Sequence, residues 1–282
     1  MPRIRRRMAP AGDPHEPLGV DWLALCRRAL AGARGALERY PTTEARAEGT
    51  GRGEGGDIAL VIDRAAEDAV LAELEKLDVP LTVISEERGE VELSGGGPVR
   101  VVVDPVDGSL NAKRRLPLPC LSIAVAEGGS MEDVVFGYVA ELEGPAEWWA
   151  RKGGGAHSHE GALPTLEPGP LEVIGIETAR PPEVAKAAEA IGRLEAKRIR
   201  ALGTVAASLC LVADGRLDAM ISLGPIRSVD AAAGRLIVEE AGGKTSFPDT
   251  EEPTLDLEMR SRVLAARDPE MLHRLRAVFG AG

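Results

Sequence analysis

The residues most able to do chemistry are two aspartates that end a run of valines. Residues 101–111 read VVVDPVDGSLN, so Asp104 and Asp107 stand three positions apart where a buried strand is expected to finish. An Asp-Pro-x-Asp-Gly segment also forms a good turn, because proline fixes φ and glycine accepts positive φ. The segment alone therefore leaves two interpretations open, a polar turn or a site for something positive.

Further acids stand at the ends of predicted elements. Glu86 closes the strand predicted over 79–85, and Asp230 opens the last predicted helix, over 231–241. If neighbouring strands run parallel, Glu86 and Asp104 reach the same sheet edge, where open α/β sheets bind ligands. Each acid also has a structural interpretation: Asp230 as a helix N-cap and Glu86 as a solvated strand end.

Carboxylates that converge repel one another unless a cation lies between them. Oxygen ligands without thiolate or imidazole suit Mg²⁺, which retains water molecules and binds substrate phosphate. Gly108 allows close approach of an anion, and a helix beginning at Ser109 would direct its first N–H groups to the same place. The chain lacks the D-x-D-x-D-G spacing of a calcium-binding EF-hand loop. The pattern is typical of a joint magnesium and phosphate site.

The apolar pattern predicts mixed α and β structure in alternating layers, an α/β (α+β) fold. Helical spacing begins near Trp22, and residues 41–57 read as a glycine-rich loop. Strands ending at Ser85 and Val103 precede a predicted hairpin, and a glycine loop over 151–162 marks the joint between two halves. The expected organisation is a basic disordered tail over 1–17, an α+β half over 18–150 with most metal ligands, and an α/β half over 151–282 with Asp230.

The composition and net charge make some classes of binding partner unfavourable. With 34 Lys and Arg against 45 Asp and Glu, the net charge of −11 disfavours nucleic acid and anionic membranes. No apolar run is long enough for a signal peptide or a membrane span, and the three cysteines form no C-x-x-C pair. We expect a cytoplasmic protein with buried thiols.

Three motifs in a fixed order, SEE (85–87), DPVDGSLN (104–111) and VDAAAGRLIVEEAGG (229–243), resemble the inositol monophosphatase family of Mg²⁺-dependent sugar phosphatases. Within that family the archaeal-type inositol monophosphatase/fructose-1,6-bisphosphatase pattern is the most similar. DIALVIDRAAEDAV (57–70) and GTVAASLCLVADGRLDAM (203–220) resemble two further family segments. The resemblance implies a layered α-β-α-β-α sandwich, two or three Mg²⁺ ions per active site and a homodimer.

The resemblance also implies roles for matching residues. One Mg²⁺ would be held by Glu86, Asp104 and the carbonyl of Val106, and a second by Asp104, Asp107 and Asp230. The residues implied in catalysis are Asp63, Glu86 and Ser109, with Ser109 orienting the attacking water rather than acting as nucleophile. The residues implied in substrate or phosphate binding are Asp107, Gly108, Ser109, Thr204, Val205 and Arg227.

The motifs define the substrate less clearly than they define the metal and phosphate site. Residues 222–229 carry no acid for sugar hydroxyls, and Arg227 could bind a substrate anion, pair with an internal carboxylate or face water. We expect hydrolysis of a small sugar or polyol phosphate, such as inositol 1-phosphate or fructose 1,6-bisphosphate. The alternatives are histidinol-phosphate or 3′-phosphoadenosine phosphatase activity, or a non-catalytic binding role.

Overall fold

The computed structural model describes residues 17–52 and 58–280. The predicted basic tail lies almost wholly outside these residues. The helices are α1 (Trp22–Glu38), α2 (Thr43–Arg46), α3 (Val61–Glu75), α4 (Ser109–Arg114), α5 (Pro181–Arg193), α6 (Val205–Ala213), α7 (Ser228–Glu240) and α8 (Pro269–Phe279), with 3₁₀ turns at Pro17–Gly19 and Met131–Asp133.

The strands form three sheets. Their bounds are β1 (Gly49–Arg52), β2 (Ile58–Leu60), β3 (Leu81–Ser85), β4 (Gly89–Leu93), β5 (Arg100–Asp107), β6 (Cys120–Ala126), β7 (Val134–Glu141), β8 (Glu147–Arg151), β9 (Gly155–Ser158), β10 (Gly161–Ala162), β11 (Val173–Glu177), β12 (Arg198–Arg200), β13 (Ala219–Ser222), β14 (Lys244–Ser246) and β15 (Leu264–Ala266). The large sheet has the order β10-β9-β8-β7-β6-β5-β3-β4, the second sheet β12-β11-β13-β15-β14, and β1 pairs with β2.

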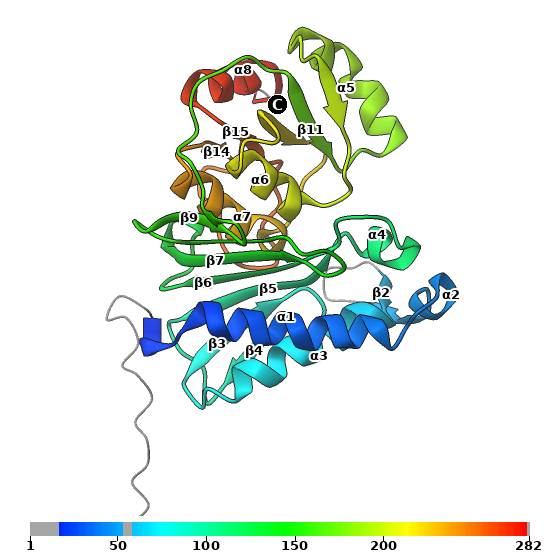
Figure 1. Cartoon of the computed structure of the whole chain (residues 1–282), viewed down its shortest axis with the longest axis vertical. Coiled ribbons are helices and arrows are strands. Elements are labelled where there is room, and N and C mark those ends of the chain that lie inside the picture. The colour runs from blue at the N-terminus through cyan, green and yellow to red at the C-terminus, as the bar shows by residue number, and fades with distance from the viewer. Residues whose placement is uncertain (1–16, 53–57, 281–282) are drawn as a thin grey trace, which may run out of the picture.

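Helices and sheets alternate in five layers (Figure 1). Helices α1 and α3 cover one face of the large sheet, α6 and α7 lie between the two sheets, and α5 and α8 cover the far face of the second sheet. Three hydrophobic clusters fill the spaces between these layers. The layered α-β-α-β-α sandwich expected from the sequence is confirmed.

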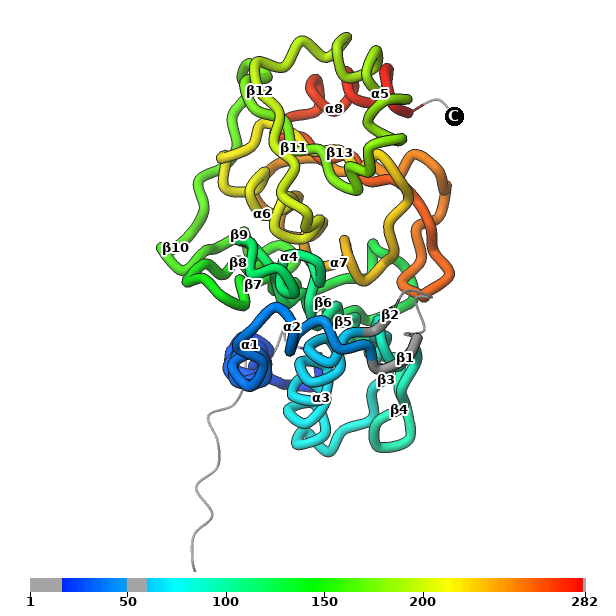
Figure 2. Tube along the Cα trace, turned by 90° about the vertical axis from the view of Figure 1, so that its right-hand side faces the viewer, coloured from blue at the N-terminus to red at the C-terminus, as the bar shows by residue number. Residues whose placement is uncertain are grey.

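The middle layer is made of the most apolar helices because it is covered on both sides. Nearly every residue of α6 is buried, and α7 buries Ser228, Val229 and the stretch from Ala231 to Val238. A helix that is apolar all round is expected only where both faces are covered. Figure 2 shows α6 and α7 between the large sheet and the strands β11 and β13. Ala206 at the start of α6 contacts Asp107 of β5, and Arg227, just before α7, contacts Glu86 after β3.

The strand pairing meets the condition under which Glu86 and Asp104 were expected to share one sheet edge. β3 and β5 are parallel, with Ser85 opposite Val103, so the residues that follow each strand emerge at one edge of the large sheet. The other pairs of that sheet are antiparallel, including the predicted hairpin of β6 and β7.

Three sequence interpretations were wrong. The expected loop over 41–57 contains α2 and β1, and Thr42 caps α2 by accepting a hydrogen bond from Ala45 N at 3.2 Å; residues 53–57 lie outside the described part. The glycine loop over 151–162 instead forms β9 and β10, because β8 supplies the hydrogen-bond partners that the short strand needs. The predicted last helix is followed by α8, whose cap Asp268 accepts from Met271 N at 2.8 Å.

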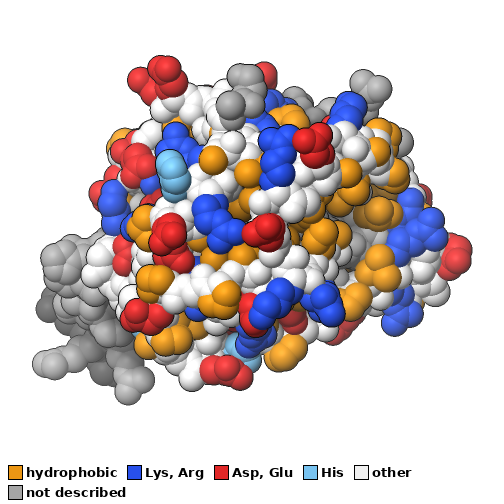
Figure 3. Space-filling model, turned by 90° about the horizontal axis from the view of Figure 1, so that it is seen from above, with side chains coloured by type: hydrophobic (Ala, Val, Ile, Leu, Met, Phe, Trp, Pro, Cys, Tyr) orange, Lys and Arg blue, Asp and Glu red, His pale blue; other side chains and the backbone are white. Residues whose placement is uncertain are grey.

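No helix among the described residues is long and apolar enough to cross a membrane. On the face seen from above in Figure 3, basic and acidic side chains are interspersed. Cys26, Cys120 and Cys210 are free and buried, as predicted.

Candidate active site

The candidate site is a pocket of about 480 Å³ between the large sheet and the second half of the chain. Its lining comes from the ends of β3, β5 and β11, from the beginnings of α4, α6 and α7, and from residue 260. Each of these elements presents a terminus, where backbone groups lack partners within the element. The pocket is therefore rich in polar groups.

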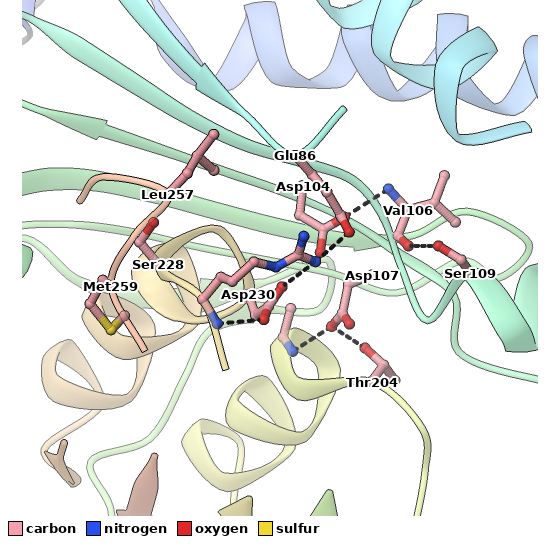
Figure 4. Close-up of polar contacts among 12 residues, drawn as sticks. Glu86, Asp104, Val106, Asp107, Ser109, Thr204, Ser228, Asp230, Leu257 and Met259 are labelled. Carbon is pink, nitrogen blue, oxygen red and sulfur yellow. Dashed lines mark hydrogen bonds and ion pairs between the residues drawn. The ribbon is translucent and has the colours of Figure 1, made fainter. Parts of the chain in front are cut away.

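Three carboxylates meet in this pocket. Glu86, Asp104 and Asp230 each place one oxygen within 4.8 Å of the others, and Figure 4 shows the three side chains coming together from β3, β5 and α7. Asp104 is 1% exposed. The prediction that Glu86 and Asp104 reach one sheet edge is confirmed, and α7 brings Asp230 to the same place from far along the chain.

Asp230 is not the N-cap of α7. The helix begins at Ser228, and Asp230 is its third residue, where its Oδ2 accepts a hydrogen bond from the N–H of Arg227 at 2.8 Å. Ser228 is fully buried and donates to the carbonyls of Leu255 and Asp256, at 3.0 and 2.7 Å. These contacts hold the first turn of α7 so that Asp230 faces Asp104.

The electrostatics of the three carboxylates favour a cation. Burial and the charges of Glu86, Asp107 and Asp230 raise the pKa of Asp104 well above its usual range. Burial also raises the pKa of Asp230, although the positive charge of Arg227 opposes this shift. Carboxylates with raised pKa values are poorly stabilised as anions by the protein alone. A divalent ion would supply the missing positive charge.

Asp107 lies beside this group but outside it. Its Oδ2 accepts hydrogen bonds from the Thr204 hydroxyl and from Ala206 N, the latter at 2.6 Å, as Figure 4 shows. Burial and the charge of Asp230 raise the pKa of Asp107 to about 8, against the lowering effect of these two bonds. These two hydrogen bonds connect β5 to the N-terminal end of α6. Both use Oδ2 of Asp107 and leave its Oδ1 for another ligand.

Two more acids extend the negative region. Asp63, in the first turn of α3, accepts from Leu60 N at 3.0 Å through Oδ2, while its buried Oδ1 has no hydrogen-bond partner. Oε2 of Glu87 is also buried without a partner. Burial, with a contribution from the Glu86 charge, raises the pKa of Asp63 to about 7 and that of Glu87 to about 8. Unpartnered carboxylate oxygens of this kind fit a site made for metal ions and their water ligands.

The turn after β5 supplies the neutral groups of the site. Gly108 has φ +86°, and α4 begins at Ser109 as predicted. The Ser109 hydroxyl donates to the Val106 carbonyl at 3.0 Å, and Val106 N donates to Asp104 Oδ1 at 3.0 Å. The Val106 carbonyl, implied as a metal ligand, retains a second lone pair. A Cβ on Gly108 would lie 3.1 Å from the Gly203 carbonyl, so glycine lets the Gly203 turn approach.

Thr204 and Val205 also line the pocket, at the cap and first residue of α6. Arg227, for which the sequence left three interpretations open, pairs with the Glu86 carboxylate. Its Nη2 also lies 3.6 Å from Asp230 Oδ1. The structure therefore supports pairing with internal carboxylates for this side chain.

Glu177 is a site residue that the sequence reasoning missed. It is 1% exposed and accepts hydrogen bonds from Leu202 N, Gly203 N and the Ser208 hydroxyl, at 3.1, 2.8 and 2.6 Å. It fixes the turn that carries Thr204. Glu177 ends β11 as Glu86 follows β3, so its position at a strand end could have identified it. Arg180 and Arg260, which also line the pocket, had no comparable signal.

The amino-acid sequence also matches the model of a known protein family. The model of the inositol monophosphatase family matches residues 23–279, which is nearly the whole described chain. The chain belongs to the inositol monophosphatase family. The family is metal-dependent, and its members are phosphatases of sugar and polyol phosphates, in keeping with the acidic group of Glu86, Asp104 and Asp230.

Relatives and solved structures agree with this assignment. The chain is 33% identical over 259 residues to a fructose-1,6-bisphosphatase/inositol-1-monophosphatase of Archaeoglobus fulgidus, covering 90% of this chain and 95% of the relative. A protein with the same description from Methanothermobacter thermautotrophicus is 32% identical over 266 residues, with 90% and 95% coverage. The Thermotoga maritima IMPase structure has a TM-score of 0.74 and 25% identity, covering 92% of this chain and 98% of that one.

Proposed function

We propose that this protein is a Mg²⁺-dependent phosphomonoesterase that hydrolyses a small sugar or polyol phosphate. The observation that carries the proposal is the group of Glu86, Asp104 and Asp230, whose oxygens lie within 4.8 Å of one another in a pocket of about 480 Å³. Hard oxygen ligands of this kind suit Mg²⁺. The raised pKa of Asp104 supports the same conclusion.

The residues divide into metal ligands and groups that position water and phosphate. Glu86, Asp104, Asp107, Asp230 and the Val106 carbonyl, which line the pocket, would hold two Mg²⁺ ions. Asp63 lies outside the pocket lining but near enough to Glu86 for that charge to affect it, and would lie beside a third ion. Bound Mg²⁺ supplies positive charge that makes water a better nucleophile and offsets negative charge on the departing oxygen. Asp63 and the Ser109 hydroxyl would orient the attacking water.

The phosphate would lie against the turn between β5 and α4. The N–H groups of Gly108 and Ser109 are placed there, and α4 begins at Ser109. Thr204 and Val205 border the same pocket from α6. The N–H groups of Gly108 and Ser109 would complement the metal ions, because neutral donors hold phosphate oxygens without adding charge.

For the substrate we propose broad or dual specificity, with inositol 1-phosphate and fructose 1,6-bisphosphate as the first candidates. The two archaeal relatives carry both activities in their descriptions. The pocket wall between β13 and α7 is formed by Pro225, Ile226 and Arg227 and presents no acid to sugar hydroxyls. That composition supports a site less selective than one built for inositol alone.

The test is release of inorganic phosphate from inositol 1-phosphate and fructose 1,6-bisphosphate, in Mg²⁺ and in EDTA. We expect release that depends on Mg²⁺, and the ratio of the two rates will rank the substrates. A protein that binds Mg²⁺ but releases nothing from either ester would direct the search to histidinol phosphate and 3′-phosphoadenosine nucleotides. A folded protein that neither binds Mg²⁺ nor releases phosphate would overturn the proposal in favour of a non-catalytic role.

We also propose a cytoplasmic location and a homodimer. The three free, buried thiols support a reducing compartment. The dimer rests on the family resemblance alone, and sedimentation velocity of the full chain tests it: a single species with the mass of two chains is expected.

A further inference from the structure

The Arg227 side chain contacts the same carboxylates that form the candidate metal site. Its guanidinium pairs with Glu86, and Nη2 lies 3.6 Å from Asp230 Oδ1. Its backbone N–H donates to the other oxygen of Asp230 at 2.8 Å. Glu86 and Asp230 are two of the three residues whose oxygens lie within 4.8 Å of one another. A metal ion and the Arg227 guanidinium would therefore bind the same two carboxylates.

This ion pair is largely shielded from water. The side chains of Arg227 and Glu86 are 15% and 16% exposed. Charge pairs in such surroundings interact more strongly than pairs on an open surface, where solvent screens them. Within residues 17–52 and 58–280, Arg227 is the only basic side chain that forms an ion pair with Glu86 or Asp230. It is their internal counter-ion.

The contact is also incomplete. Nη1 of Arg227 is buried and has no hydrogen-bond partner. A guanidinium binds a carboxylate most firmly through two parallel N–H bonds, and this pairing lacks that geometry. The pair can therefore be exchanged for a divalent ion, which carries twice the charge and accepts several oxygen ligands.

We propose that Arg227 is a built-in competitor of the metal ion, which neutralises Glu86 and Asp230 and must give up these contacts, at least in part, for the metal to bind. The proposal rests on the metal site of the proposed function. It identifies Arg227 as the residue that determines the affinity of that site for the metal ion. Arg227 stabilises the protein without metal and weakens metal binding by the same interaction. The metal concentration that the protein requires is thereby set by one side chain.

The test is direct Mg²⁺ binding by calorimetry, without substrate, together with thermal unfolding in EDTA. The Arg227→Gln variant removes the charge and keeps a polar side chain. We expect it to bind Mg²⁺ at least about fivefold more tightly than the natural protein. Its melting temperature in EDTA should be lower, and the rise in melting temperature on adding Mg²⁺ should be larger. Unchanged or weaker Mg²⁺ binding by the folded variant would overturn the proposal.

Arg260→Gln is the matched control. Arg260 lines the same pocket, but its Nη1 donates to the carbonyls of Leu257 and Met259, at 2.5 and 2.9 Å, and it forms no ion pair with Glu86 or Asp230. Its Mg²⁺ affinity is expected to stay within about twofold of the natural protein because exposed charges are screened. An increase in Mg²⁺ affinity equal to that of Arg227→Gln would contradict the proposal that Arg227 competes specifically with the metal ion.

The Arg227→Lys variant covers the case in which Arg227→Gln does not fold. Lysine keeps one charge on a shorter side chain, so its contact with Glu86 is weakened and its Mg²⁺ affinity should lie between those of the natural protein and the glutamine variant. Affinity equal to or below that of the natural protein would overturn the proposal. Because no readout involves turnover, this result is independent of whether the chosen phosphate esters are hydrolysed.

Discussion

At the scale of single residues, the site gathers acids that the protein alone stabilises poorly as anions. Asp104 is almost fully buried, and its neighbours Glu86, Asp107 and Asp230 add negative charge. Such an arrangement costs folding free energy unless protons or cations neutralise it. Function and stability should therefore respond in opposite directions when one of these charges is removed.

Asp104→Asn tests this opposition. The amide retains the acceptor for Val106 N but loses the negative charge, so we expect turnover to fall roughly a thousandfold. In EDTA the variant should be more stable than the natural protein by about 1–2 kcal/mol, because a buried repulsive charge is gone. Phosphate-release assays and urea unfolding measure the two effects. A variant that is less stable in EDTA would contradict this account of Asp104.

Thr204→Val tests the hydrogen bonds by which Thr204 connects α6 to Asp107. Thr204 caps α6 by accepting from Ala207 N at 3.4 Å and donates its hydroxyl to Asp107. Loss of both contacts should lower the free energy of unfolding by about 1–2 kcal/mol and reduce turnover. Thr204→Ser is the matched control, since it keeps the hydroxyl and should retain most of both properties. A larger loss in Thr204→Ser than in Thr204→Val would assign the effect to packing of the methyl group, which valine keeps and serine lacks.

At the scale of elements, the site depends on termini that approach one another closely. The turn between β5 and α4 meets the turn before α6 at Gly108 and Gly203. Glu177 holds the second turn through three hydrogen bonds and so places Thr204 against Asp107. The two turns thus meet at the atoms that would bind phosphate and metal.

Gly108→Ala should damage this junction. Gly108 has φ +86°, and the new Cβ would lie 3.1 Å from the Gly203 carbonyl, so backbone strain of about 1–2 kcal/mol adds to a displaced turn. We expect both stability and turnover to fall. In the control Gly153→Ala, φ is +74° but nothing lies within 4 Å of the new Cβ, so stability should fall while turnover is kept. Full turnover in Gly108→Ala would show that the approach of the two turns is dispensable.

At the scale of the whole molecule, the sequence predicted the layered fold and the approach of Glu86 to Asp104, but not several contacts between distant segments. The acids could be found because each stands at the end of a regular element and belongs to a family motif, and two apolar runs located β3 and β5, whose parallel pairing the structure shows. Glu177 and the pairing of Arg227 depend on contacts between distant segments, which periodicity does not encode. The short strands β9 and β10 form only because β8 offers a partner, so composition alone indicated a loop.

Stability of the whole protein should depend on pH and metal together. The pKa of Asp63 is raised to about 7, and those of Glu87 and Asp107 to about 8, from ordinary values near 4. Between about pH 4 and pH 8 the folded protein therefore binds more protons than the unfolded chain, and its free energy of unfolding falls as pH rises. In EDTA, the melting temperature should be lower at pH 8 than at pH 5.5.

Excess Mg²⁺ should oppose this loss, because the ion takes the place of protons at ionised carboxylates. The rise in melting temperature on adding Mg²⁺ is expected to be larger at pH 8 than at pH 5.5, as measured by differential scanning fluorimetry. An equal rise at both pH values would argue that the ion binds away from these acids.

The most direct test of the metal site is anomalous diffraction from a crystal grown or soaked with Mn²⁺, which substitutes for Mg²⁺ at oxygen ligands. We predict strong anomalous density among the carboxylates of Glu86, Asp104 and Asp230, with a peak at about 2.2 Å from an oxygen of Asp104 and from an oxygen of at least one of the other two. The same peak should be absent from crystals of Asp104→Asn. A Mn²⁺-treated crystal with no peak among these three residues, or with peaks only elsewhere, would contradict the assignment of this pocket as the metal centre.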